Sequence, residues 1–219
     1  MSVNQQHTLF LKNCSNSKIF IETGTFMGST AKWGQKHFEN VITIENSEDI
    51  YKQIANELNA FSNVKAKFGN SKNILSELEE IKESNVIYWL DAHWCGGLSY
   101  GEFDQCPLVE ELEIIKKNGG ENPIIMIDDA RLFLSPPPAP NRIDEYPNIL
   151  QICEPFKNTH IPYIFEDVIY IIPSKYAIEF AKLLQTEASD KLNKEYELNK
   201  NKWLNIKIKL AELKNLIFK

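Results

Sequence analysis

The feature of this sequence that most constrains its fold is an alternation, between residues 19 and 172, of short apolar runs with longer amphipathic stretches. Two of the runs, at 86–90 and 124–127, are apolar at every position, which is typical of strands buried on both faces of a sheet. Strands that alternate with helices indicate βαβ units and a parallel sheet. The runs expected to form these strands are 18–22, 41–45, 64–69, 85–91 and 123–128.

Two further apolar runs, at 160–165 and 168–172, are separated only by Glu166 and Asp167. A two-residue connection predicts an antiparallel hairpin, so we expect a doubly wound α/β fold whose mostly parallel sheet is closed by a hairpin. The preceding stretch, 134–148, is rich in proline, which excludes a helix interior or a central strand. It is either a stiff connector or a wall of the substrate site, since it follows the carboxyl end of a strand.

The last part of the chain, 174–219, is highly charged, contains neither glycine nor proline, and is predicted to be helical. We therefore expect one domain at 1–173, with 174–219 as its C-terminal helical extension. Apolar residues recur there at helical spacing, which fits either helices that pack on the body or a contact between copies in a homo-oligomer. These positions are Ile178, Ala181, Leu184, Ala188, Leu192, Trp203, Ile206, Leu210, Leu213 and Ile217.

The composition and charge of the chain exclude several functional classes. The formal net charge of −6 argues against a general nucleic-acid binder, because such affinity depends on Lys and Arg at phosphates. No apolar run reaches the roughly 20 residues of a membrane span, and residues 1–10 lack the pattern of a secretory signal. The four cysteines lack metal-ligand spacing and are expected to stay reduced, which favours a cytoplasmic protein. A redox pair of Cys95 and Cys106 is the alternative, although no C-x-x-C spacing supports it.

A strand, a turn of small residues and a helix start follow one another at residues 19–30. Gly24 and Gly28 let the backbone approach a ligand closely, and a helix start offers N–H groups that the helix leaves unpaired. In open α/β sheets, ligands bind at the carboxyl ends of the strands, near the switch point of the strand order. Glu45, about 20 residues further on, is placed to bind the ribose hydroxyls of an adenosine-containing cofactor.

The third run ends in Asn70 and Ser71, polar residues that are well placed for the adenine edge of such a cofactor. Phe26 fills the middle glycine position of the G-x-G-x-x-G motif, which disfavours a nicotinamide-dinucleotide site. The sequence also lacks G-x-x-x-x-G-K-[ST], which disfavours a P-loop nucleotide hydrolase.

Acidic residues follow the fourth and fifth runs: Asp91 after the fourth, and Asp128 and Asp129 after the fifth. Parallel strands end at one edge of a sheet, so three carboxylates would repel one another there unless a cation neutralises them. Oxygen ligands suit a hard cation such as Mg²⁺. The alternative is structural, since Asp at a strand end often caps the next helix or fixes a turn.

Residues 22–30 resemble the cofactor motif E-x-G-[AT]-[FY]-x-G-x-[ST] of the metal-dependent O-methyltransferases, a family that includes the catechol and macrocin types. The resemblance covers about residues 18–172. It implies a seven-stranded Rossmann-like sheet, S-adenosylmethionine as cofactor, and Mg²⁺ held by Asp91, Asp128 and Asp129. The cofactor-binding residues expected from the resemblance and the strand pattern are Glu22, Thr23, Gly24, Thr25, Phe26, Gly28, Ser29, Thr30, Glu45, Asn70, Ser71 and Asp91.

The candidates for the general base lie just after the fourth run. His93 is the first candidate because histidine titrates near neutral pH, and Asp91 is the second. In the catechol type a lysine shortly after the metal-binding Asp is thought to be the base, but here Cys95 and two glycines follow. The segment 95–106, with its glycines and aromatic residues, is expected to form a mobile lid.

Substrate contacts are expected from aromatic residues that could stack on a sugar ring and from arginines that could bind a phosphate or carboxylate. The resemblance to the macrocin type favours a hydroxyl of a sugar, a sugar nucleotide or another small polar metabolite of glycan or natural-product biosynthesis. The residues expected to contact the substrate are Trp94, Tyr100, Arg131, Arg142 and Tyr146.

Two alternatives from other classes remain open at this point. One is a metal-independent methyltransferase that acts on nitrogen or on a protein, whose turnover chelators would not abolish. The other is a non-catalytic binding or scaffold protein with a vestigial site, which need not bind S-adenosylmethionine.

Overall fold

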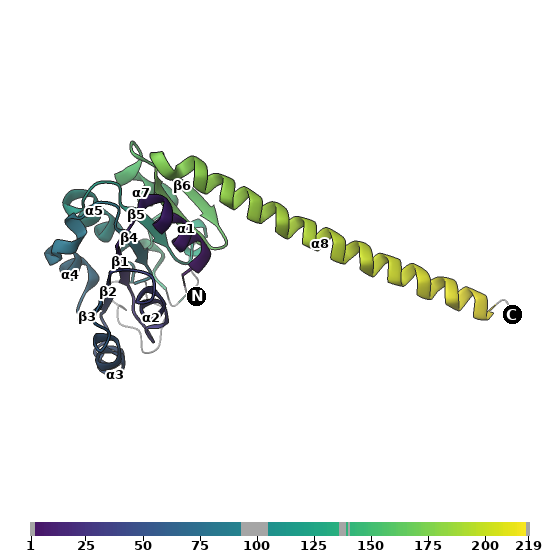
Figure 1. Cartoon of the computed structure of the whole chain (residues 1–219), viewed down its shortest axis with the longest axis horizontal. Helices are drawn as coiled ribbons and strands as arrows, with labels where there is room; N and C mark the ends of the chain where they lie inside the picture. Colours follow the sequence, from purple (N-terminus) through teal and green to yellow (C-terminus); the bar gives the residue numbers. More distant parts are fainter. Residues whose placement is uncertain (1–2, 93–104, 136–138, 140, 218–219) are drawn as a thin grey trace. The chain divides into compact units, whose positions relative to one another are not determined.

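The computed structural model describes residues 3–92, 105–135, 139 and 141–217 of the chain (Figure 1). The chain divides into two units, Met1–Ala177 and Ile178–Lys219, and each is described by itself. The first contains the sheet with its covering helices, and the second consists of most of the last helix, α8 (Ser174–Ile217). Among the described residues, no helix is both long enough and apolar enough to cross a membrane.

The described part of the first unit is built around a seven-stranded sheet in the order β3-β2-β1-β4-β5-β7-β6. The strands β1 to β5 run parallel, and β7 pairs antiparallel with both β5 and β6. This arrangement confirms the predicted doubly wound, mostly parallel sheet with a closing hairpin, and it places the switch point between β1 and β4. The strands are β1 (Ile19–Thr23), β2 (Asn40–Glu45), β3 (Val64–Phe68), β4 (Ile87–Leu90), β5 (Ile124–Ile127), β6 (His160–Phe165) and β7 (Val168–Pro173).

Several helices begin at a residue whose side chain caps the first turn. Asn4, Ser47 and Asn70 each accept a hydrogen bond from a backbone N–H at the start of α1, α3 and α4. Such caps satisfy donors that the helix itself leaves unpaired. Besides α8, the described α-helices are α1 (Gln5–Ser15), α2 (Ser29–Gly34), α3 (Glu48–Asn59), α4 (Ser71–Glu77), α5 (Leu108–Asn118), α6 (Arg131–Leu134) and α7 (Ile149–Cys153). Short 3₁₀ helices lie at Glu79–Lys82, Ile143–Glu145 and Glu154–Phe156.

Helices cover both faces of the sheet (Figure 1). On one face the ring of Phe20 contacts the ring of Trp33 in α2. On the other face Ile21 belongs to a core that includes Leu75 of α4 and Leu112 of α5. Every residue of β1, β4, β5 and β7 is buried, which explains why their sequences are runs without a polar alternation.

The turn of the closing hairpin consists of Glu166 and Asp167, as the sequence predicts. Both residues have positive φ angles, 48° and 67°, as a type I′ turn requires to match the twist of a hairpin. Because β7 runs antiparallel to β5, with Ile169 opposite Ile127, the turn lies at the edge where β5 ends. The hairpin therefore brings an acidic residue, Asp167, to the carboxyl ends of the parallel strands.

Candidate functional site at the carboxyl edge of the sheet

The turn after β1 packs directly against the end of β4. The N–H groups of Gly24 and Thr25 donate to the carbonyl of Ile44 at the end of β2, at 2.9 and 3.3 Å. Gly24 has a φ of +83°, and a Cβ at this position would collide with the carbonyl oxygen of Asp91. Only glycine fits a positive φ and so close an approach. The turn thus joins the ends of β1, β2 and β4 at the switch point.

The same turn presents apolar side chains to solvent. Phe26 has a φ of 45° and is 66% exposed, and Met27 is 51% exposed. Gly28, with a φ of +73°, is the residue before α2 and provides no capping side chain. Because Gly28 has no side chain, it does not cap the backbone N–H groups at the start of α2. We expect such an uncapped helix start in a turn that binds a ligand.

Glu45 ties the glycine turn to the end of β2. Its side chain is 7% exposed; Oε2 accepts the N–H of Phe26 at 2.9 Å, and Oε1 accepts the N–H of Ser47 at 2.8 Å. A carboxylate has about four acceptor positions, so these two bonds leave acceptor capacity for hydroxyl donors. Glu45, the residue predicted to bind the ribose, is therefore already oriented by two backbone N–H groups, one from each side.

Glu22 is buried beneath the turn, on the face of the sheet that α2 covers. The hydroxyl of Thr43 donates to its Oε2 at 2.6 Å, and Thr43 in turn lies 2.6 Å from the hydroxyl of Thr25. Burial raises the pKa of Glu22 to about 8, the hydrogen bond from Thr43 partly offsets this, and the nearby charges of Asp91 and Glu45 add to the rise. At neutral pH this carboxyl therefore holds a proton.

Asp91 and Asp128 follow neighbouring strands, as predicted. The N–H of Asp91 donates to the Thr23 carbonyl at 3.0 Å, and the N–H of Asp128 donates to the Leu90 carbonyl at 3.1 Å. Asp128 is 2% exposed and its Oδ1 accepts the N–H of Asp129 at 2.8 Å, while burial raises the pKa of its carboxyl above the ordinary value. Both residues therefore reach the edge where Gly24 lies.

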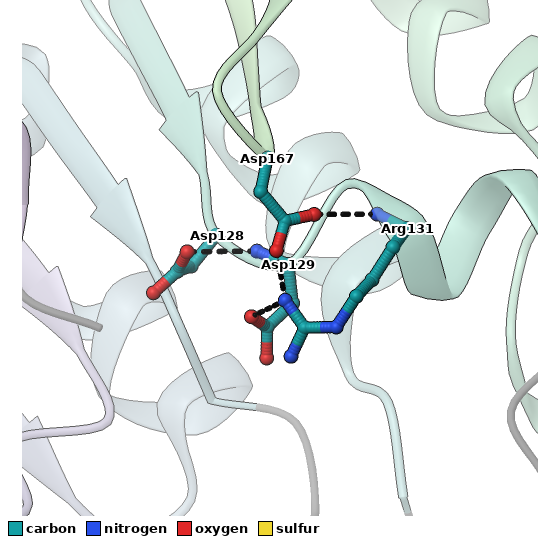
Figure 2. A network of polar contacts seen from close by, with 4 residues as sticks. All are labelled: Asp128, Asp129, Arg131 and Asp167. Atoms are coloured by element: carbon teal, nitrogen blue, oxygen red, sulfur yellow. Dashed lines mark hydrogen bonds and ion pairs between the residues drawn. The ribbon is translucent and has the colours of Figure 1, made fainter. Parts of the chain in front are cut away.

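Asp129, Arg131 and Asp167 form an ion-pair network at the end of β5 (Figure 2). A φ of 57° turns Asp129 so that its Oδ1 lies 2.6 Å from Nη1 of Arg131. The same guanidinium pairs with the carboxylate of Asp167, which also accepts the backbone N–H of Arg131 at 2.9 Å. The Asp167 carbonyl accepts the N–H of Ala130 at 2.8 Å. One arginine thus joins the end of β5 to the hairpin turn.

This network affects the predicted metal site. Among the described residues, no three His, Cys, Asp or Glu side chains are gathered closely enough to hold a metal ion. The carboxylate of Asp129 is engaged by Arg131, whereas that of Asp128 takes no part in this ion pair (Figure 2). In this arrangement the three residues do not fit a Mg²⁺ site.

The other predicted site residues are distributed unevenly. His93, Trp94, Tyr100 and Cys95 lie outside the described residues.

Arg142 is exposed and pairs with Asp144 and Glu145, at 3.2 and 2.7 Å. Tyr146 is half-buried and its ring lies 6.4 Å from that of Phe133. Asn70 caps α4 through a hydrogen bond from the Lys72 N–H at 3.0 Å, and Ser71 is buried next to it.

Sequence reasoning missed one further buried acid near this edge, Glu111 of α5. It is 1% exposed, and burial raises the pKa of its carboxyl to about 7. The side chains of Ser71 and Thr23 partly offset this rise in the pKa. A small cavity beside Glu111 is lined by Ala92 and Phe133. The one signal in the sequence was its helical spacing from apolar Leu108 and Ile115, directly before Leu112.

Comparisons with known proteins agree with this architecture. No protein-family model and no curated protein matches the sequence. Among solved structures, TomG of Streptomyces achromogenes, an O-methyltransferase involved in tomaymycin synthesis and solved with S-adenosylmethionine, matches with a TM-score of 0.54 and 14% identity, covering 80% of this chain and 82% of that one. A Staphylococcus aureus protein assigned as a caffeoyl-CoA O-methyltransferase matches with a TM-score of 0.56 and 13% identity, covering 78% and 85%. The chain therefore has the Rossmann-like fold that S-adenosylmethionine-dependent O-methyltransferases share.

The raised pKa of Glu22 predicts how stability changes with pH. The folded protein holds a proton on Glu22 up to about pH 8, whereas the unfolded chain releases it near the ordinary value of 4.5. The stability that this protonated carboxyl contributes is complete below pH 4.5 and is lost as pH rises through 8. Glu22→Gln removes this titration. As pH rises from 4.5 to 8, the melting temperature of the variant should therefore rise relative to that of the wild type. The change is roughly 2–4 °C for each kcal/mol of stability that the wild type loses.

Thermal melts of the two proteins across this range measure the difference directly. Glu39→Gln is the matched control, because Glu39 is an exposed partner of Lys18. A constant difference in melting temperature between Glu22→Gln and the wild type across this pH range would show that Glu22 is ionised in the folded protein.

Proposed function

We propose that this protein is an S-adenosylmethionine-dependent methyltransferase that methylates a hydroxyl oxygen. The observation that carries the proposal is the glycine turn at Gly24, which packs on Asp91 between two buried acids, Glu22 and Glu45. The solved structures with the same fold support it, because they include an O-methyltransferase with S-adenosylmethionine bound. A sulfonium cofactor also suits an edge at which acidic side chains gather, since it carries the opposite charge.

The cofactor is proposed to lie across the turn from Glu22 to Gly28. Glu45 accepts the ribose hydroxyls through the acceptor capacity that its two backbone bonds leave. The adenine edge lies toward Asn70 and Ser71, at the start of α4. The methionine part lies over the remaining residues of the two strand ends, the turn and the start of α2, which are Thr23, Thr25, Phe26, Ser29, Thr30 and Asp91.

The reaction is an in-line displacement at the methyl carbon. The substrate oxygen attacks this carbon while its bond to sulfur breaks, which yields the methyl ether and S-adenosylhomocysteine. The chain's own task is to align the two reactants and to accept the hydroxyl proton. His93 and Asp91 are the proposed proton acceptors; Asp91 follows β4 and its backbone borders the glycine turn.

A neutral hydroxyl, as in a sugar, is the substrate group that the described charges favour. Arg131 and Arg142, the two predicted anion ligands, each pair with two carboxylates of the chain itself. Their charge is therefore compensated, and a phosphate would compete with these ion pairs. Stacking of a ring on Tyr146, Trp94 or Tyr100 then carries more of the proposed recognition.

Magnesium assistance, a place in glycan or natural-product biosynthesis, a cytoplasmic location and self-association through the C-terminal helix stay predictions. A metal-independent reaction is the second candidate, and the ion pair between Arg131 and Asp129 favours it. Mg²⁺ could use Asp129 only if this pair opens.

Replacing Glu45 tests the cofactor site. Glu45→Ala removes a charge-assisted hydrogen bond worth roughly 1.5–3 kcal/mol, so the affinity for S-adenosylhomocysteine in calorimetry should fall about tenfold or more. Glu45→Gln keeps one acceptor oxygen and should recover part of the loss. Glu39→Ala, at an exposed position, should bind like the wild type. Unchanged affinity in Glu45→Ala would remove Glu45 from the site, and a wild type without affinity would favour the scaffold alternative.

Replacing Arg131 tests the metal prediction without the need for a substrate. If the three acidic residues can bind a divalent cation, Arg131→Ala frees Asp129 and should bind Mn²⁺ at least about tenfold more tightly than the wild type. Arg142→Ala removes an equally exposed arginine and should leave Mn²⁺ affinity unchanged. Absence of Mn²⁺ binding in both the wild type and Arg131→Ala, measured by calorimetry, would show the metal prediction to be wrong.

A further inference from the structure

The second unit of the chain carries a stripe of exposed apolar side chains. Within α8, Leu192, Tyr196 and Trp203 are each 66% exposed, and Ile206 is 49% exposed. Their spacing of four, seven and three residues places them on one side of a helix. In the sequence the same spacing continues with leucine at 210 and 213 and isoleucine at 217. We call these seven positions the apolar stripe.

Lysines flank the apolar stripe on both sides. At about 100° per residue, Lys200 and Lys207 lie to one side of the stripe and Lys202 lies to the other, and all three are exposed. Residues 200–219 contain six lysines and one glutamate, although the whole chain has a formal net charge of −6. Positive charge is therefore concentrated on the part of the helix that carries the stripe from Trp203 onward.

This charge pattern disfavours a second copy of the chain as the partner of residues 200–217. When two helices pair along such a stripe, the residues that flank it on one helix face those that flank it on the other. Two copies would place lysines opposite lysines, which destabilises the pair. Asn199, which lies between Tyr196 and Trp203 on this side of the helix, adds no compensating charge.

The distribution of apolar residues also exceeds what one partner helix would cover. Ten of the sixteen residues at 203–218 are apolar in the sequence, including positions outside the stripe such as 204, 208, 216 and 218. In a two-stranded coiled coil the positions away from the seam face water and are polar. A lipid interface covers a wider sector of a helix and is typically met by Trp, Phe and Leu together with Lys.

We propose that this part of α8 binds a membrane surface that bears anionic lipid head groups. The apolar stripe lies at the boundary between head groups and acyl chains, and the lysines lie beside the lipid phosphates. The helix rests in the plane of the surface and does not cross it. The interaction holds the first unit, with its candidate methyltransferase site, near that surface.

Co-sedimentation of the full chain with lipid vesicles tests this proposal. The protein should sediment with vesicles of phosphatidylcholine that contain roughly a third phosphatidylglycerol, and not with vesicles of phosphatidylcholine alone. Added salt should weaken the binding because it screens the lysines. The triple variant Lys200→Gln, Lys202→Gln and Lys207→Gln should bind at least about tenfold more weakly.

Two controls show whether the vesicles bind to α8 itself. The variant Lys18→Gln, Lys52→Gln and Lys82→Gln carries the same net charge, changes exposed lysines of the first unit, and should bind vesicles like the wild type. The tryptophan emission of the wild type should shift to the blue with anionic vesicles, and that of Trp203→Phe should not, because Trp203 is the tryptophan that enters the interface.

Three outcomes would overturn the proposal. Equal binding to both kinds of vesicle, or equal loss in the two triple lysine variants, would show that the lysines of α8 do not recognise anionic lipid. An emission shift that Trp203→Phe retains would place the contact elsewhere. A dimer mass in light scattering without lipid, lost in Trp203→Ser with Ile206→Ser, would show that a second copy covers the stripe.

Discussion

The close approach of the turn after β1 to the end of β4 is the contact on which the candidate site depends. Gly24 lies so near the carbonyl of Asp91, with a φ of +83°, that any side chain there would displace the backbone. Because the turn also hydrogen-bonds to the Ile44 carbonyl, three strand ends are fixed together. The buried carboxyl groups of Glu22 and Glu45 and the backbone of Asp91 are thereby brought to one place. In an open α/β sheet this is where a ligand binds.

Charge at this edge is balanced by protons and by an arginine. Burial raises the pKa of Glu22 to about 8 and that of Glu111 to about 7, so at pH 7 Glu22 is mostly protonated and Glu111 is protonated in part. At the end of β5 the guanidinium of Arg131 neutralises part of the charge of Asp129 and Asp167. Only some of the acids at this edge are therefore ionised at neutral pH. A cationic cofactor adds a favourable interaction with those that remain charged.

The sequence predicts the sheet well because fully buried strands leave uninterrupted apolar runs, as at 86–90 and 124–127. The hairpin follows from the two residues that separate its strands, and the ends of β4 and β5 follow from their acidic residues. Contacts between distant segments are not visible in such patterns. Asp167 reaches Arg131 only because β7 inserts beside β5, and the runs alone do not give that strand order. The engagement of Asp129, which decides whether a metal fits, depends on this pairing.

The central claim is that the edge around Gly24 binds S-adenosylmethionine, and calorimetric titration of the full chain with this cofactor tests it most directly. Gly24→Ala places a methyl group against the Asp91 carbonyl, whereas Gly34→Ala adds one in ordinary contact with Phe20 and Val41. We predict that the wild type and Gly34→Ala bind with equal affinity and that Gly24→Ala loses at least about tenfold, or 1.4 kcal/mol, while all three proteins remain folded by circular dichroism. A wild type that does not bind, or a folded Gly24→Ala that binds equally well, would contradict this claim.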